Sequence, residues 1–192
     1  MKILIIAHAR SGSTNLANAI CNLTGDTLYF EPFNSQRSHR EDNWLNSPPK
    51  DIPENCVVKT IIFQNKTWVR ERAKDFDLVI FLSRANIREV FISAQNAYNK
   101  NNYHGIYIND AEPTDDMMRF VSIQYKMLTH MNMLLSKDSL VNSRFVWYED
   151  IFCEEVEHSL SSIRNLGIDC SQEKFTNVWK KWLSPKKRLR II

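Results

Sequence analysis

Cysteines are few in this chain, and none is arranged as a metal ligand or a redox pair. Four occur among 192 residues, at positions 21, 56, 153 and 170. None belongs to a CxxC pair, and none has a histidine at metal-ligand spacing. Cysteine-based zinc sites need such clusters. We therefore interpret the four thiols as reduced side chains, and we predict no metal site.

Long apolar segments are also missing. The first apolar run, Ile3 to Ala7, reaches His8 and Arg10 almost at once. A secretory signal needs a longer apolar region and a cleavage site, and a membrane-spanning helix needs about 20 apolar residues. We expect a cytoplasmic protein with no membrane partner.

Neither sign of charge is in strong excess. The formal net charge is +3, whereas a nucleic-acid-binding domain is expected to carry a clustered basic face. Nucleic acid is therefore not a predicted partner. A mild positive charge is compatible with a protein that holds a polyanionic small molecule in one local pocket. The length and the 43% apolar content suit a single domain over residues 1–192.

Short apolar runs alternate with segments of helical periodicity along the whole chain. Strands are predicted at residues 3–7, 27–30, 56–62, 78–82 and 145–148. Helices are predicted at residues 16–23 (ended by Gly25), 68–74, 87–98 (after Asn86 as N-cap), 117–134, 156–166 (closed by Gly167) and 178–183. This alternation is typical of an α/β domain with a central parallel sheet of about five strands flanked by helices in three layers.

Two long connections and one helical stripe need separate interpretation. The apolar residues of the long helix, Met117, Phe120, Met127, Met131 and Leu134, are expected to pack in the core. The segments 34–55 and 99–113 are expected to be surface loops. Their aromatic side chains either stack on a bound molecule or pack the loops down; these are Trp44, Tyr98, Tyr103 and Tyr107.

The first strand and helix are joined by a short polar turn. Its residues are Arg10, Ser11, Gly12, Ser13, Thr14 and Asn15. Backbone N–H groups at a helix N-terminus point outward at the positive end of the helix dipole, where phosphate or sulfate binds favourably. Ser13 and Thr14 add donors, and Arg10 adds a guanidinium fork for anionic oxygens. A capped helix start with polar turn residues is the alternative interpretation.

This turn lacks the lysine of the nucleoside-triphosphatase loop GxxxxGK[ST]. It resembles instead the 5′-phosphosulfate loop of the sulfotransferases that use PAPS (3′-phosphoadenosine 5′-phosphosulfate). Arg10 to Thr14 and Leu16 match the RSGST-x-L pattern, and Ala9 stands where that family usually has proline. The resemblance implies a P-loop-like α/β fold, and binding of PAPS and its product PAP without a metal. This resemblance extends over residues 3–183, along which the motifs occur in the same order as in the family.

The same resemblance assigns the donor's 3′-phosphate to a second group of residues. Arg84, after the fourth strand, and Ser93, on the following helix, form an LxRxN…S pattern close to that of bacterial sulfotransferases. The alternative for Arg84 is a solvent-exposed arginine at a strand end. Tyr148, in the Tyr148-Glu149-Asp150-Ile151 segment, is expected to contact the adenine. Glu149 and Asp150 are expected to cap a helix and brace the sheet.

Glu31 is the predicted general base. The segment Phe30-Glu31-Pro32 resembles one in carbohydrate sulfotransferases, and a carboxylate suits proton removal from an acceptor hydroxyl. Lys59-Thr60 resembles the lysine–threonine pair of cytosolic sulfotransferases, but Ile61 stands where they have a catalytic histidine. Lys59 and Arg10 are expected to stabilise negative charge on the transferring group. The alternatives are a loop glutamate paired with a basic neighbour and an ordinary strand-end lysine.

The function predicted from the sequence is transfer of a sulfuryl group from PAPS to a hydroxyl or amine of a carbohydrate or other small acceptor. Two other functions stay open. One is a P-loop-type nucleotide kinase, which needs Mg²⁺ and a carboxylate to hold it. The other is a catalytically inactive module that binds PAP or another nucleotide. The sequence identifies neither the acceptor nor the oligomeric state.

Overall fold

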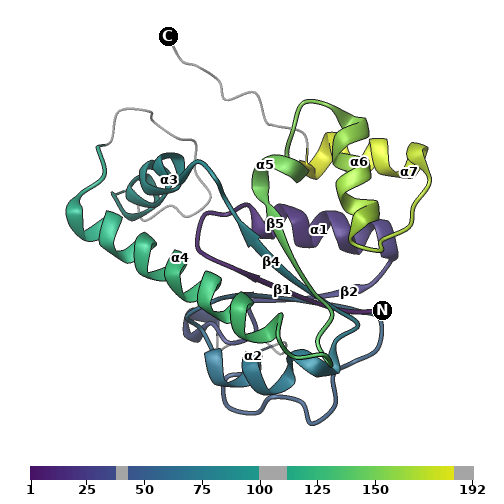
Figure 1. Ribbon diagram of the computed structural model, residues 1–192, viewed down its shortest axis with the longest axis horizontal. Helices are drawn as coiled ribbons and strands as arrows, with labels where there is room; N and C mark the ends of the chain where they lie inside the picture. The colour runs from purple at the N-terminus through teal and green to yellow at the C-terminus, as the bar shows by residue number, and fades with distance from the viewer. Residues whose placement is uncertain (38–42, 100–111, 184–192) are drawn as a thin grey trace.

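Five parallel strands form the centre of the molecule (Figure 1). They are β1 (Lys2–Ala7), β2 (Thr27–Phe30), β3 (Cys56–Ile61), β4 (Leu78–Ser83) and β5 (Ser143–Trp147), in the order β2-β3-β1-β4-β5. The structure is a computed structural model that describes residues 1–37, 43–99 and 112–183. The predicted α/β fold with a five-stranded parallel sheet flanked by helices is confirmed.

The central strands are apolar along their whole length because both faces of the sheet are covered. In β1, Ile3, Ile5 and Ala7 face one hydrophobic core, and Leu4 and Ile6 face the other. Strands β3 and β4 are likewise buried at every position. These two cores fix the register of the sheet, since a shift of one residue would exchange the two faces of a strand.

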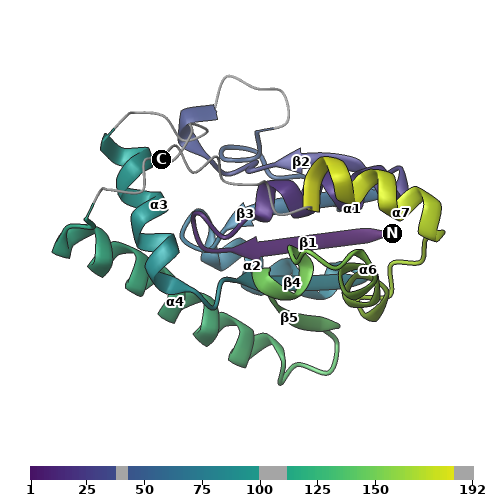
Figure 2. The ribbon, with the colours of Figure 1, turned by 90° about the horizontal axis from the view of Figure 1, so that it is seen from above.

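Helices cover both faces of the sheet. One face is covered by α1 (Ser13–Thr24), α5 (Tyr148–Ile151), α6 (Val156–Asn165), α7 (Gln172–Val178) and the π-helical turn Trp179–Leu183. The other is covered by α2 (Lys66–Arg72) and α4 (Asp115–Leu135). Helix α3 (Ile87–Asn99) packs on α4 beyond the carboxyl ends of the strands, as Figures 1 and 2 show.

Two helix boundaries were predictable from their capping residues. Gly25 ends α1 in the left-handed conformation, with φ 83°, where glycine has no Cβ penalty. The side-chain oxygen of Asn86 accepts a hydrogen bond from the N–H of Glu89 at 3.3 Å, as an N-cap does. Both predictions are confirmed.

The prediction of which α4 residues are buried was partly wrong. Phe120 and Leu134 are 48% and 40% exposed. The buried positions are instead Val121, Gln124, Leu128, Met131 and Leu135. These recur at intervals of three and four residues and so form one face of the helix. The sequence carries apolar residues on two adjacent faces of α4, so periodicity alone did not identify the face toward the sheet.

Two further expectations need correction. The segment 34–55 is not purely a surface loop, because Trp44 and Ile52 are buried and Trp44 packs against Tyr29, Phe33 and Trp68. Trp44 therefore packs its loop down. The fifth strand ends at Trp147, and Tyr148 begins α5.

The remaining predictions concern single residues. Tyr98 is exposed, whereas Tyr103 and Tyr107 lie outside the described residues. All four cysteines are free. Burial raises the pKa of Cys21 to about 12, which makes its thiol a poor nucleophile. Among the described helices, none is long and apolar enough to cross a membrane.

Candidate functional site

Five of the residues predicted to act on a ligand lie at one edge of the sheet. The strands are all parallel, so their carboxyl ends meet at the same edge, where ligands of open α/β sheets bind. Arg10 follows β1, Glu31 follows β2, Arg84 follows β4 and Tyr148 follows β5. Lys59 lies near the end of β3. The topology thus gathers residues from five separate stretches of the chain.

The turn after β1 presents backbone donors. Gly12 has φ 83° and precedes α1, which runs for 12 residues. Its carbonyl accepts hydrogen bonds from the N–H groups of Asn15 and Leu16 at 3.0 and 3.1 Å. Within the described residues, the N–H groups of Gly12, Ser13 and Thr14 have no backbone acceptor. Unpaired donors at the N-terminus of a helix this long can bind an anionic oxygen.

Ser11 and Ser13 are both buried in this turn. The Ser11 hydroxyl has no hydrogen-bond partner in the described part of the chain. Thr14 and Asn15 are half-buried on the first turn of α1, and the Thr14 carbonyl accepts from the Asn18 side chain at 2.8 Å. The turn therefore offers an unpaired serine hydroxyl as well as backbone donors.

Arg10 and Ser93 are in direct contact. The Nε of Arg10 donates a hydrogen bond to the Oγ of Ser93 at 2.8 Å. The sequence predicted that these two residues bind opposite ends of the nucleotide, whereas in the structure they lie in direct contact. Arg10 adopts φ 65°, a left-handed conformation that costs a residue with a side chain about 1–2 kcal/mol. Its surroundings must enforce that conformation.

Arg84 is nearly buried between carboxylates and an aromatic ring. It forms an ion pair with Glu89, and its Nε lies 3.9 Å from an oxygen of Glu149. Its guanidinium lies over the Tyr148 ring, 4.4 Å from the centroid. Its side chain is 12% exposed, so the alternative of a solvent-exposed strand-end arginine was wrong.

Glu149 has the bracing role that the sequence predicted. Its carboxylate accepts hydrogen bonds from the N–H groups of Ala85 and Asn86 at 2.9 and 3.1 Å. This ties the start of α5 to the turn that follows β4, and so holds Arg84 in place.

The Tyr148 ring packs closely against the turn after β1, at Gly12. The ring stacks on Phe152, with centroids 4.2 Å apart and planes 9° apart. Because Phe152 and Arg84 both lie close over the ring, they occupy its two faces. A Cβ atom at Gly12 would meet two Tyr148 ring carbons at 2.6 and 2.7 Å. Tyr148 can therefore reach an adenine by its edge or hydroxyl, while its faces are used in packing.

Glu31 and Lys59 form an ion pair at the ends of β2 and β3. Lys59 is only 2% exposed, and its ammonium also lies 4.6 Å from the centroid of the Phe30 ring. The same Glu31 carboxylate accepts hydrogen bonds from Asn34 at 2.8 Å and Gln64 at 3.2 Å. The pairing with a basic neighbour, which was the alternative interpretation of Glu31, is thus present, and Lys59 is far more buried than an ordinary strand-end lysine.

The charge state of Glu31 follows from these contacts. Burial by itself would raise the pKa of Glu31, but the positive charge of Lys59 and the three hydrogen bonds outweigh it, so its pKa lies below the ordinary value. Glu31 is therefore a carboxylate at neutral pH. It also adopts φ 48°, so two of the three described non-glycine residues with positive φ are site residues, Arg10 and Glu31. Such backbone outliers concentrate at functional sites.

Sequence reasoning missed three polar residues of this region. Gln64 links Glu31 to Thr60, whose hydroxyl donates to the Gln64 side chain at 3.1 Å. Asn34 lies a few residues after the end of β2, and Gln64 lies a few residues after the end of β3. A polar residue so soon after a parallel strand is a sequence signal for the carboxyl edge of the sheet. Gln124 comes from the middle of α4 and accepts a hydrogen bond from the Ala9 N–H at 2.9 Å. That contact joins residues 115 positions apart, so no local pattern could predict it.

His8 is buried at the carboxyl end of β1. Its Nδ1 donates to the Ala9 carbonyl at 2.8 Å, and its Nε2 has no partner among the described residues. Burial lowers the pKa of His8, the bond to Ala9 raises it, and the charge of Arg84 lowers it further. The net effect is a lower pKa, so His8 is neutral at pH 7.

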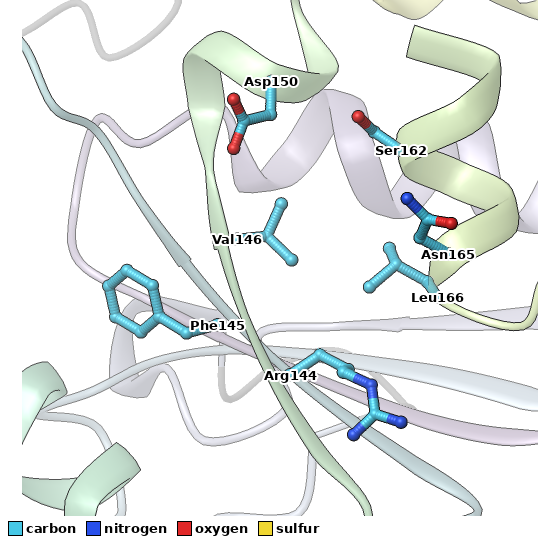
Figure 3. A pocket seen from close by; sticks show the side chains of 7 residues that line it. All are labelled: Arg144, Phe145, Val146, Asp150, Ser162, Asn165 and Leu166. Atoms are coloured by element: carbon cyan, nitrogen blue, oxygen red, sulfur yellow. The ribbon is translucent and has the colours of Figure 1, made fainter. Parts of the chain in front are cut away.

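A hollow of about 210 Å³ lies elsewhere, between β5 and α6. Figure 3 shows Val146 pointing toward α6 and Phe145 pointing to the opposite side of the strand. The lining of this hollow includes Arg144, Asp150 and Asn165 but none of the residues predicted to bind a ligand.

In the described ranges, no group of three or more histidine, cysteine, aspartate or glutamate side chains could hold a metal ion.

Comparisons with known proteins support the fold. No family model matches the chain, and no curated protein matches it in sequence. Among solved structures, one of a mouse sulfotransferase, SULT7A1, complexed with PAP superposes with a TM-score of 0.57 at 15% sequence identity. The match covers 94% of this chain and 63% of the mouse chain. This chain thus shares its fold with a sulfotransferase and spans less than two thirds of that protein's length.

Proposed function

We propose that this protein is a sulfotransferase that moves a sulfuryl group from PAPS to a hydroxyl or amine of a small acceptor. The observation that carries the proposal is the turn after β1, where backbone donors with no acceptor among the described residues adjoin Arg10 and Ser93. Arg84 adds a second guanidinium at the same sheet edge. Its fold is also that of a solved sulfotransferase structure whose ligand is PAP.

In the proposed complex, the donor nucleotide lies along the carboxyl edge of the sheet. The N–H groups of Gly12 to Thr14 and the Ser11 hydroxyl bind the 5′-phosphosulfate with Arg10, and Arg84 and Ser93 bind the 3′-phosphate. Tyr148 contacts the adenine by its edge. The contact between Arg10 and Ser93 makes these two anion sites adjacent. The chain needs no metal ion for this binding, because arginines and backbone donors neutralise the phosphates.

The proposed reaction is an in-line displacement at sulfur. The acceptor oxygen attacks sulfur while Glu31 takes its proton, and the bond from sulfur to the 5′-phosphate oxygen breaks. Negative charge then builds on that oxygen, and PAP leaves with it. Arg10 and Lys59 stabilise this charge, which is the preorganised electrostatic effect that usually contributes most to catalysis.

The ion pair between Glu31 and Lys59 is consistent with both of their proposed roles. In the resting state Lys59 lowers the pKa of Glu31 and keeps it ionised. As Lys59 turns toward the charge developing on the leaving oxygen, its hold on Glu31 weakens and the proton affinity of the carboxylate rises. Proton transfer and bond cleavage would then assist each other. We further propose a carbohydrate acceptor, because the segment around Glu31 resembles that of carbohydrate sulfotransferases.

We expect Arg84→Ala to weaken PAP binding by about 1.5–3 kcal/mol, the usual worth of a hydrogen bond to a charged group. Binding of AMP, which has no 3′-phosphate, should barely change. Isothermal titration of both nucleotides measures the difference.

Glu89→Gln is the matched control, because it breaks the same ion pair while keeping the arginine. Removing this competing carboxylate should leave PAP affinity equal or stronger. Equal losses in the two variants, or equal losses for PAP and AMP, would refute the assignment of Arg84 to the 3′-phosphate.

A further inference from the structure

The backbone just before Arg10 is held by two side chains that form opposite hydrogen bonds with one residue. Gln124 on α4 accepts from the Ala9 N–H at 2.9 Å, and His8 Nδ1 lies 2.8 Å from the Ala9 carbonyl. A carbonyl oxygen can only accept, so His8 Nδ1 carries the proton. Both polar groups of the Ala9 backbone are therefore fixed by side chains, one of them from a distant helix.

The turn that these contacts hold is an unfavourable one. Ala9 and Arg10 lie in a turn, and Arg10 has φ 65° whereas Ala9 is not among the residues with positive φ. This combination fits the central residues of a type II turn, whose third position favours glycine. An arginine there costs about 1–2 kcal/mol relative to the ordinary backbone conformation. Something outside the turn must therefore stabilise it.

His8 and Gln124 are costly choices for a packing role. Both side chains are buried, yet His8 Nε2 and Gln124 Nε2 have no hydrogen-bond partner within the part of the chain that the structure describes. A buried polar group without a partner is unfavourable, so an apolar residue would pack better at either position. The bonds to Ala9 are the contacts that account for polar residues there.

We infer that Gln124 and His8 are positioning residues, which act together as a clamp on Ala9 that holds Arg10 in its anion-binding conformation. The clamp connects α4 to the turn after β1, so the position of Arg10 depends on the packing of α4. Proline at position 9 would serve the same purpose covalently, because it fixes φ and is favoured at the second position of a type II turn. The inference rests on the proposed function only in the choice of PAP as the ligand whose binding is measured.

Gln124→Met tests the clamp, because methionine matches glutamine in length but cannot accept the hydrogen bond. Hydrogen–deuterium exchange of the segment 8–14 should become faster, and PAP should bind roughly three- to tenfold more weakly, the worth of one neutral hydrogen bond. Lys126→Met, an exposed position on the same helix, is the control and should change neither.

A second substitution that restores the lost constraint distinguishes a positioning role of Gln124 from a packing role. Adding Ala9→Pro to Gln124→Met should return both exchange and PAP affinity toward the wild-type values, since the ring replaces the lost constraint. If Gln124→Met does not fold, Gln124→Asn, which is too short to reach Ala9, takes its place. The clamp is overturned if hydrogen–deuterium exchange in the Gln124 variant equals that of the wild type. It is also overturned if adding Ala9→Pro restores neither exchange nor PAP affinity. Faster exchange that proline reverses, in a protein that does not bind PAP, supports the clamp and refutes the proposed function.

Discussion

Glu31→Gln should lower the rate of sulfuryl transfer by about 10²–10⁴-fold, the usual contribution of a general base. Glutamine keeps the shape of the side chain and can still accept hydrogen bonds from Asn34 and Gln64, but it cannot take the acceptor's proton. Because Glu31 serves the acceptor side of the site, PAP affinity should stay nearly unchanged. The measurement is transfer from labelled PAPS to a working acceptor, with PAP titration of the same preparation.

The buried charge of Lys59 complicates this variant, so the assay needs a control. Without Glu31 the ammonium loses its ion-pair partner, and the rate must be normalised to the folded fraction. Asn34→Ala removes one hydrogen bond to the same carboxylate and keeps the base. Its rate should fall by about tenfold at most, because one hydrogen bond is worth about 1 kcal/mol. Equal rates for the two variants would remove Glu31 from the reaction.

Gly12→Ala should lower the free energy of unfolding by about 2–4 kcal/mol. About 1–2 kcal/mol comes from placing a side chain at φ 83°. The rest comes from overpacking, because the new Cβ would lie 2.6 Å from the Tyr148 ring. That ring cannot withdraw easily, since Phe152 and Arg84 lie on its two faces. Chemical denaturation of the wild type and the variant measures the loss.

The chain supplies a matched control for the contact with Tyr148. Gly25 has the same φ of 83°, but a Cβ there would meet nothing within 4 Å. Gly25→Ala should therefore lose only the backbone contribution, about 1–2 kcal/mol. The difference between the two variants is the cost of the steric contact. Equal losses would mean that Tyr148 does not support the turn after β1.

Much of the sheet could be predicted because its signals are local. The runs at 3–7 and 78–82 are apolar at every position, as in strands covered on both faces. Gly25 and Asn86 marked helix ends for equally local reasons. The sheet edge that gathers Arg10, Glu31 and Arg84 also followed from the sequence, because parallel strands place their carboxyl ends together.

The parts that could not be predicted depend on contacts between distant segments. Phe120 and Leu134 are exposed because α4 packs through a neighbouring face, and the choice between two apolar faces depends on the sheet. Trp44 is buried by residues from three other segments. The partner of Arg10 was expected to be an anion, whereas the structure adds Ser93 from α3. Such pairs have no sequence spacing that could reveal them.

The most direct test of the proposed function is calorimetric titration of the wild-type protein with PAP, AMP and ATP, in EDTA and again with Mg²⁺. We expect PAP to bind more tightly than AMP or ATP and EDTA to leave its affinity unchanged, because arginines and backbone donors bind both anionic ends. Transfer from PAPS in EDTA should likewise proceed. Equal affinity for PAP and AMP, or nucleotide binding that appears only with Mg²⁺ and ATP, would refute the proposed sulfotransferase function and favour a kinase.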